Sequence, residues 1–314
     1  MAYGVRREAC VVTHRPIMLR EVLHWLRPTP GDVAVDCTLG AGGHAMALLE
    51  RILPGGRLIG LDVDPLELPQ TEARMRASGF GRDVFAAHRR NFADLEAVFA
   101  EAGVAGADIV LADLGVSAMQ HDVAARGFSY KLPGPLDLRL DPSAGRPASR
   151  LLEALDETQL SELLTAHADE PHAETIASLV MRQPVTTTHA LERVVRTGLA
   201  QARPDLSKAD LKRSVRRTFQ ALRIAVNDEF GALERFLEAL PRCLAPGGRV
   251  VVLTFHSGED RRVKQAFRTG RRNGTYAMVA DRVVRSTKEE TFTNRRSSSA
   301  KLRWAVRAEG RARG

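Results

Sequence analysis

The sequence predicts an α/β protein in which a parallel sheet flanked by helices is interrupted by an all-helical insertion. Two observations support this fold class. In the first half, short apolar segments of strand length alternate with segments of helical periodicity. From about residue 125 to residue 217 no strand-like segment occurs, and one then returns at residues 250–255. Because this last strand belongs with the sheet begun before the helices, we interpret the helices as an insertion.

The first half contains four strand-like segments rich in Val, Ile and Leu, each flanked by turn residues. They are residues 33–39, 57–62, 84–88 and 108–114. Between them, residues 45–52, 65–77 and 92–102 have helical periodicity. Strands that alternate with helices are typical of a parallel sheet covered on both faces.

The middle of the chain is predicted to be helical at residues 147–166, 171–182 and 188–202, with Pro184 and Pro204 as helix breakers. One long helix is then expected at residues 219–244, followed by a turn at 245–248 and a buried strand at 250–255. We therefore predict a sheet domain made of residues 1–125 and 217–314, with a helical domain at residues 126–216.

The composition excludes several classes of protein. The 314 residues, 44% of them hydrophobic, can bury a large core, and no run of 18 apolar residues predicts a membrane span. Residues 1–14 contain no apolar stretch of signal-peptide length. Cys10, Cys37 and Cys243 have no paired spacing, which argues against a disulfide framework or a zinc knuckle. We expect a cytoplasmic protein without a metal.

Positive charge is concentrated at the end of the chain. The net charge is +8, and residues 261–314 hold 16 Lys or Arg against four acids, so the rest of the chain is slightly acidic. A basic segment of this kind predicts a polyanionic partner, although a solvated, partly disordered tail is the simpler alternative. The aromatic content of 5% argues against a platform on which many bases stack.

A glycine-rich turn directly after the first strand is the strongest local signal. It is the run Asp36-Cys37-Thr38-Leu39-Gly40-Ala41-Gly42-Gly43-His44, and Asp62 ends the second strand 22 residues after Gly40. Glycines let the backbone approach a nucleotide, and an acid at this separation can accept hydrogen bonds from ribose hydroxyls. The glycine spacing is not that of nicotinamide-binding dehydrogenases. A tight turn alone would need glycine for steric reasons, but the turn and the acid together predict an adenosine cofactor.

Further candidates follow the third and fourth strands. Asp113 ends the fourth strand, where ligands bind in open α/β sheets, although it could instead cap the next helix. Gln120 could reach the same crevice or be an ordinary polar loop residue. Phe92 could stack on an adenine or belong to the core. For His44 and His256 we find no second ligand at metal spacing, so zinc is not expected.

The chain resembles the bacterial small-subunit ribosomal RNA cytosine N-4 methyltransferases of the RsmH or MraW type over nearly its whole length. Nine motifs carry the resemblance in the correct order: HRPIMLREVL, DCTLGAGGH, GLDVDP, DLGVSAMQ, RGFSY, GPLDLRLD, TFQALRIAVNDE, FHSGEDRRVK and NRRSSSAKLR. The resemblance implies a Rossmann-like class I methyltransferase sheet with a nested helical domain that contacts RNA. It also implies S-adenosyl-L-methionine as cofactor and a cytidine in the decoding region of 16S rRNA, or of the small ribosomal subunit, as substrate.

The resemblance assigns cofactor binding to seven positions here: Gly42, Gly43, His44, Asp62, Phe92, Asp113 and Gln120. Three departures from the family pattern lie outside them. Gly258 replaces the leucine of FHSLED, Leu138 and Leu140 replace two methionines, and residues 167–170 replace YGEE. Gly258 puts the rigidity of its loop and the fit of the substrate in question.

We expect Asp113, or a backbone carbonyl beside it, to accept a hydrogen from the target amine, whose lone pair is delocalised into the cytosine ring. Residues 127–141, with Phe128 and Tyr130 and the charged Asp137 and Arg139, could form the base pocket or simply pack the two domains together. The basic cluster at residues 208–217 and the C-terminal segment would hold phosphates.

Three alternatives stay open at this point. They are a nicotinamide-dependent oxidoreductase, a non-catalytic ribosome-assembly factor, and an amine methyltransferase that acts on DNA or another RNA. The sequence does not determine the oligomeric state, and a homodimer stays open.

Overall fold

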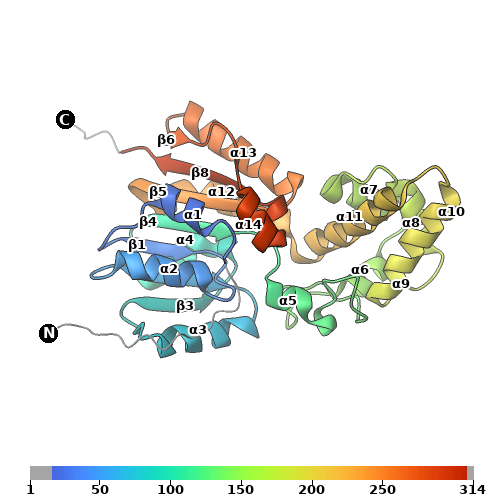
Figure 1. The fold of residues 1–314 in the computed structure, drawn as a ribbon, viewed down its shortest axis with the longest axis horizontal. Coiled ribbons are helices and arrows are strands. Elements are labelled where there is room, and N and C mark those ends of the chain that lie inside the picture. The colour runs from blue at the N-terminus through green and yellow to red at the C-terminus, as the bar shows by residue number, and fades with distance from the viewer. Residues whose placement is uncertain (1–15, 310–314) are drawn as a thin grey trace.

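A computed structural model describes residues 16–309. Its sheet has eight strands, and β7 (Val284–Arg285) pairs with β8 beside the main order β3-β2-β1-β4-β5-β8-β6 (Figure 1). The other strands are β1 (Val33–Asp36), β2 (Arg57–Asp62), β3 (Phe85–Arg89), β4 (Ala107–Asp113), β5 (Leu244–Thr254), β6 (Tyr276–Val279) and β8 (Lys301–Arg307). Strands β1 to β5 pair in parallel, whereas β8 is antiparallel to β5 and β6. The α/β class and the parallel arrangement predicted from the sequence are confirmed.

Helices cover both faces of the sheet, because successive strand residues point to opposite sides. One core, which includes Val35 and Val252, is closed by α4 (Leu95–Ala102), α12 (Glu229–Cys243) and α13 (Ser257–Arg272). The other core includes the neighbouring residues Ala34 and Val251. It is closed by α1 (Leu19–Leu26), α2 (Gly43–Ile52) and α3 (Glu67–Ala77).

A third core lies among helices, at the right of Figure 1. Its helices are α6 (Ala148–Ala154), α7 (Glu157–Ala168), α8 (Ala173–Met181), α9 (Thr188–Arg193), α10 (Leu199–Ala202) and α11 (Lys208–Asn227). Helix α11 crosses the predicted boundary at residues 216 and 217, and its Phe219 and Leu222 still belong to this core. The domain limits 126–216 therefore stay a prediction that divides one continuous helix.

Two predicted helices are wrong in extent. The segment 147–166 is two helices, because Leu155 is extended and Asp156 caps α7 through its side chain. The segment 219–244 spans the end of α11 and all of α12, and the chain turns at Asp228 in a left-handed conformation with φ 47°. At this turn the chain passes from the helical core to the sheet core.

The predicted turn at residues 245–248 lies inside β5. Its residues form an irregularity in the pairing with β4, which resumes between Ile109 and Arg249. Gly248 permits this close approach, because a Cβ there would lie 2.8 Å from the carbonyl oxygen of Ala107.

The basic C-terminal segment is folded through residue 309, so the alternative of a disordered tail is wrong for the part that the structure describes. It forms α13, β6, β7, α14 (Lys288–Thr293) and β8. Strand β8 was not predicted because its alternation is masked by Arg303, which is buried and pairs with Asp260 at 2.6 Å. Among residues 16–309, no helix is long and apolar enough to cross a membrane.

Candidate active site

A cavity of about 620 Å³ lies where β1, β2 and β4 end, between the sheet and the helical region. Ligands bind at this edge in open α/β sheets, because the loops after neighbouring strands converge there. Six of the seven predicted cofactor positions line the cavity: Gly43, His44, Asp62, Phe92, Asp113 and Gln120. The seventh, Gly42, is not part of the wall.

The glycine turn has the backbone geometry that its sequence predicts. Gly40 and Gly42 have φ values of 46° and 78°, in the left-handed region that side chains rarely adopt. A Cβ on Gly42 would also lie 2.9 Å from Cγ2 of Thr71, so this glycine is needed for packing against α3. The first two residues of α2, Gly43 and His44, line the cavity, and the N-terminus of a helix can bind an anionic group.

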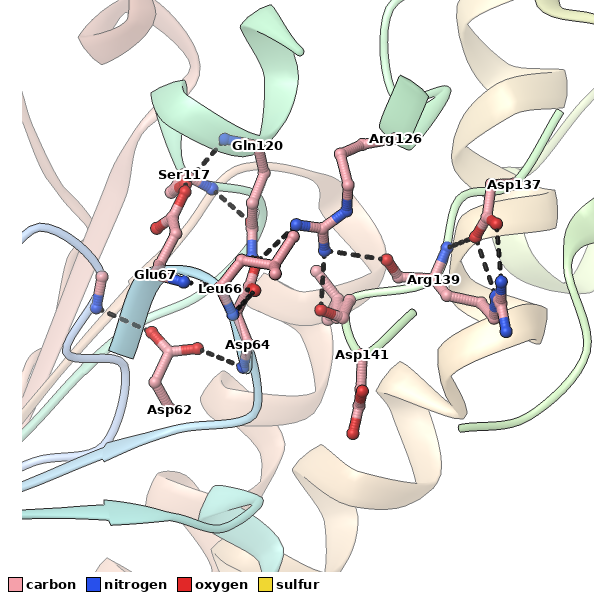
Figure 2. Close-up of polar contacts among 12 residues, drawn as sticks. Asp62, Asp64, Leu66, Glu67, Ser117, Gln120, Arg126, Asp137, Arg139 and Asp141 are labelled. Carbon is pink, nitrogen blue, oxygen red and sulfur yellow. Dashed lines mark hydrogen bonds and ion pairs between the residues drawn. The ribbon is translucent and has the colours of Figure 1, made fainter. Parts of the chain in front are cut away.

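Asp62 holds this turn in place. Its Oδ2 accepts a hydrogen bond from the backbone N–H of Gly40 at 2.8 Å, and Oδ1 accepts one from Asp64 at 2.9 Å (Figure 2). Each carboxylate oxygen has further lone pairs that can accept from hydroxyl groups of a ligand. Burial raises the pKa of Asp62, although the two backbone hydrogen bonds oppose the shift.

Asp113 and His44 leave polar atoms without protein partners. Nε2 of His44 lies 3.5 Å from Oδ2 of Asp113. Within the described range, Oδ1 of Asp113 and both ring nitrogens of His44 are buried and make no hydrogen bond. Such atoms are costly unless a ligand or water satisfies them, so the pair is suited to contact a polar ligand. The alternative that Asp113 caps the next helix is wrong, since Ser117 caps α5 (Ala118–Asp122).

Gln120 and Phe92 each combine a structural contact with a place on the cavity wall. Gln120 is buried, accepts from the N–H of Ser117 at 3.0 Å and donates to Oδ2 of Asp64 at 2.8 Å (Figure 2). Phe92 packs edge-on against Phe236 with ring centroids 5.5 Å apart. Both side chains also line the cavity, so the core and ligand interpretations of Phe92 are compatible.

The opposite wall comes from residues 127–141, for which the sequence left open a base pocket or packing between the two domains. Phe128, Tyr130, Leu138 and Leu140 line the cavity. Asp137 and Arg139 are not on this wall; the Nε and Nη2 atoms of Arg139 bond the two carboxylate oxygens of Asp137 at 2.9 and 2.8 Å. The wall that the two leucines help to form is therefore largely apolar, as a pocket for the face of a base would be.

An ion-pair cluster at the cavity, with side chains 5% to 18% exposed, was not predicted. Arg223 donates to both oxygens of Glu229 at 2.7 and 2.9 Å, and His256 lies 3.0 Å from Glu259. Burial pushes the pKa of Glu259 upward, but His256 and Arg223 together outweigh burial and lower it. The advance signal was the three-residue spacing of His256 and Glu259, so the statement that His256 has no second ligand at metal spacing is wrong.

This cluster has the donor atoms of a metal site, since ligand atoms of Glu229, His256 and Glu259 lie within 4.8 Å of one another. However, Arg223 already occupies both oxygens of Glu229, and backbone amides of Phe255 and His256 occupy Oε2 of Glu259. The arginine supplies the positive charge that a metal would bring, so we interpret the cluster as an ion-pair network.

Deeper in the site, burial raises the pKa of Asp36 to about 6, although the nearby His44 acts in the opposite direction.

The basic cluster of residues 208–217 is only partly directed to the cavity. Arg216 lines it, whereas Arg213 pairs with Asp210 and Arg217 lies 3.9 Å from Glu170.

The chain is similar to known methylases over most of its length. Residues 11–308 match the model of the MraW methylase family. Ribosomal RNA small subunit methyltransferase H 2 of Alkaliphilus metalliredigens is 43% identical over 300 residues, covering 94% of this chain and 85% of the relative. Ribosomal RNA small subunit methyltransferase H of Anaeromyxobacter sp. strain K is 39% identical over 310 residues, covering 92% and 96%.

The resemblance predicted from the motifs is thus confirmed, and the non-catalytic and nicotinamide-dependent alternatives gain no support. With a match along nearly all of its length and relatives at about 40% identity, the chain belongs to the MraW methylase family of methyltransferases.

Proposed function

We propose that this protein transfers a methyl group from S-adenosyl-L-methionine to the exocyclic N-4 amine of a cytidine in the decoding region of 16S rRNA. The observation that carries the proposal is that the glycine turn and Asp62 line the same cavity as the unpaired polar atoms of Asp113 and His44. The relatives named above are small-subunit rRNA methyltransferases, which supports rRNA as substrate. Action in the cytoplasm, where the subunits are found, is part of the proposal.

The residues present fit the cofactor. The glycine turn and the α2 N-terminus offer amides to a carboxylate, Asp62 offers oxygens to ribose hydroxyls, and Phe92 offers an apolar face. When bound, the sulfonium group supplies an electrophilic methyl. The protein's task is then to place the target amine in line with the sulfur–methyl bond, which breaks during the transfer.

Asp113 is our candidate catalytic residue. A cytosine amine becomes nucleophilic when a hydrogen-bond acceptor draws on one of its hydrogens, and the unpaired Oδ1 of Asp113 is such an acceptor at the cavity. As the new N–C bond forms, the amine must lose one proton, which the Asp113 carboxylate can take. His44 is close enough to fix the orientation of this carboxylate.

The target base must leave its stack to reach Asp113, and the apolar wall of Phe128, Tyr130, Leu138 and Leu140 can receive it.

Outside the cavity, one face of α13 carries a row of basic residues at helical spacing, Arg261, Lys264, Arg268 and Arg271. Helix α13 begins at the cavity, where its cap His256 lines the wall. Among the residues that the structure describes, Arg268 and Arg271 have no ion-pair partner, so they are available for RNA phosphates.

The decisive experiment measures N-4-methylated cytidine by mass spectrometry of nucleosides from small subunits that lack this modification. We expect the signal to rise on incubation with the protein and S-adenosyl-L-methionine. Deproteinised 16S rRNA in a parallel reaction distinguishes naked RNA from the assembled subunit as substrate. No increase with either would contradict the proposed function.

A further inference from the structure

Arg126 joins the cofactor side of the cavity to the opposite wall. It ends a short 3-10 turn (Ala124–Arg126), and its side chain is 8% exposed. Nη1 donates to Oδ2 of Asp64 at 2.7 Å, while Nη2 donates to the carbonyl oxygens of Leu140 at 2.8 Å and Arg139 at 3.1 Å (Figure 2). One guanidinium thus bonds two segments that are about 75 residues apart in the sequence.

On the cofactor side of the cavity, Asp64 connects Arg126 to Asp62. Asp64 is fully buried, and its backbone N–H donates to Oδ1 of Asp62. Its carboxylate is held from two further directions, by the N–H of Leu66 at 2.8 Å and by Nε2 of Gln120 at 2.8 Å (Figure 2). The position of Arg126 is therefore fixed relative to the acid that holds the glycine turn.

On the opposite side of the cavity, Arg126 bonds a segment of the wall whose backbone is strained at Leu138. Leu138 has φ 65°, which is unfavourable for a residue with a side chain and persists only when its neighbours hold it. Its N–H donates to the carbonyl oxygen of Arg126 at 3.1 Å. Asn227 bonds the carbonyl oxygen of Leu138 at 2.8 Å and the N–H of Leu140 at 2.7 Å. Arg126 and Asn227 together hold this wall from its two sides.

We propose that Arg126 is a positioning residue, which sets the distance between the Asp62 side of the cavity and the Leu138–Leu140 wall, and so aligns the target base with the methyl donor. The inference rests on the proposed function. The guanidinium does not line the cavity, so it acts through the two leucines rather than by touching the substrate.

This role predicts a selective loss. Without Arg126 the wall can shift, and a displacement of about 1 Å at a reacting centre can cost about 100-fold in rate. We therefore expect kcat/KM for the RNA to fall by about that factor. The Kd for S-adenosyl-L-methionine should change far less, because Asp62 is held by backbone amides of Gly40 and Asp64 that the substitution leaves in place.

The test compares Arg126→Lys, Arg126→Met and the double variant Asp64→Asn/Arg126→Met with the wild type. Arg126→Met leaves Asp64 buried without its charged partner and can fail to fold, whereas the double variant leaves neither charge unpaired. Arg126→Lys keeps the charge but cannot form the planar fork, so it should recover activity only in part.

Arg76→Met is the matched control. Arg76 also donates to two backbone carbonyl oxygens, those of Phe80 and Phe85, both at 2.9 Å, and it pairs with Glu72 at 3.0 Å. It is partly buried but lies away from the cavity lining. Its removal should lower Tm without changing kcat/KM for the folded protein.

Each variant is assayed for Tm, for the Kd of the cofactor by calorimetry, for kcat and KM with small subunits, and for hydrogen exchange at residues 138–140. We expect the Arg126 variants alone to combine a large loss in kcat/KM with faster exchange at these amides. A kcat/KM that stays at the wild-type value while Tm falls, as expected for Arg76→Met, or unchanged exchange in the double variant, would overturn the inference. The exchange measurement needs no substrate, so it decides even if the wild type methylates no rRNA, which would contradict only the proposed function.

Discussion

His44 and Asp113 lie side by side on the cavity wall but come from two different elements, with 3.5 Å between Nε2 of the imidazole and Oδ2 of the carboxylate. His44 lies in the first turn of α2, and Asp113 is the last residue of β4. The backbone N–H of Asp113 donates to the hydroxyl of Thr38 at 2.7 Å, which ties the strand end to the segment that leads into the glycine turn. This arrangement leaves Oδ1 of Asp113 free to accept from a ligand.

Asp113→Asn should lower kcat for methyl transfer by about 100-fold or more, because an amide cannot take the proton of the target amine. The Kd for S-adenosyl-L-methionine, measured by calorimetry, should change much less. Single-turnover assays with small subunits measure the first quantity. Equal losses in transfer and cofactor affinity would instead assign Asp113 to cofactor binding.

Asp62→Ala should weaken cofactor binding by about 10- to 100-fold, the range expected when a charged hydrogen-bond acceptor is lost. The substitution also releases the N–H of Gly40, which loosens the glycine turn. Asp205→Ala, which removes an exposed acid paired with Arg203, serves as the control and should bind normally. An unchanged Kd in Asp62→Ala would contradict the placement of the cofactor at this turn.

Asp36→Asn should alter the pH dependence of stability. Burial raises the pKa of Asp36 to about 6 from 3.8, so between these values the folded state binds more protons than the unfolded state. The wild type therefore loses stability as the pH rises from about 4 to 6, by about 3 kcal/mol for a shift of this size. The Asp36→Asn variant does not lose stability over this pH range, because an amide does not titrate there. Its side-chain oxygen can still accept the hydrogen bond from the N–H of Thr38.

In urea titrations, the free energy of unfolding of Asp36→Asn relative to the wild type should thus increase from pH 4 to pH 7. A difference that is the same at both pH values would contradict the raised pKa. The comparison between the two proteins cancels the titration of all other groups that the substitution does not perturb.

Gly258→Leu, which restores the residue common in the family, should destabilise this protein by about 1–3 kcal/mol. A Cβ at Gly258 would lie 2.5 Å from Cζ of Phe230, whose ring is covered by the guanidinium of Arg262 at 3.6 Å. The aromatic ring thus fills the space that a leucine would need. Phe230→Leu combined with Gly258→Leu should recover much of the Tm, and purely additive losses would contradict this compensation.

Arg268→Gln/Arg271→Gln should reduce the salt dependence of RNA binding. If both side chains contact phosphates, the slope of log K against log salt concentration should fall by about 1.5 to 2. Arg51→Gln/Arg82→Gln is the control, because both arginines are exposed and belong to segments other than α13, at the end of α2 and before β3. Equal slopes for the two double variants would show that α13 is not an RNA surface.

Much of the fold and the cofactor half of the site could be predicted because both depend on local pattern. Strand β2 was predicted to the residue, and β1, β3 and β4 to within a few residues, because buried parallel strands are apolar runs bounded by turns. The turn from Gly40 to Gly43 and Asp62 needed only strand order, since the ends of adjacent parallel strands must lie close together.

The features that were missed depend on contacts between distant segments. The helical periodicity continues through Asp228, and only packing against two different cores decides that the chain turns there. Strand β8 contains a buried arginine that is tolerated because Asp260, 43 residues earlier, neutralises it. The identity of a charged residue does not by itself show whether the fold brings a residue of opposite charge into contact with it.

By itself, the sequence determined the α/β class, the glycine turn, the acid beside it and the family of methyltransferases, because each of these can be recognised from short segments of the sequence. Only the tertiary structure decided that Arg223 would neutralise Glu229 and that Arg126 would bridge Asp64 and Leu140. Arg223 and Glu229 line the cavity, and Arg126 holds Leu140 of its wall. These contacts are absent from any local pattern because a buried charge is stable only with a partner, and the folded chain alone brings the two together.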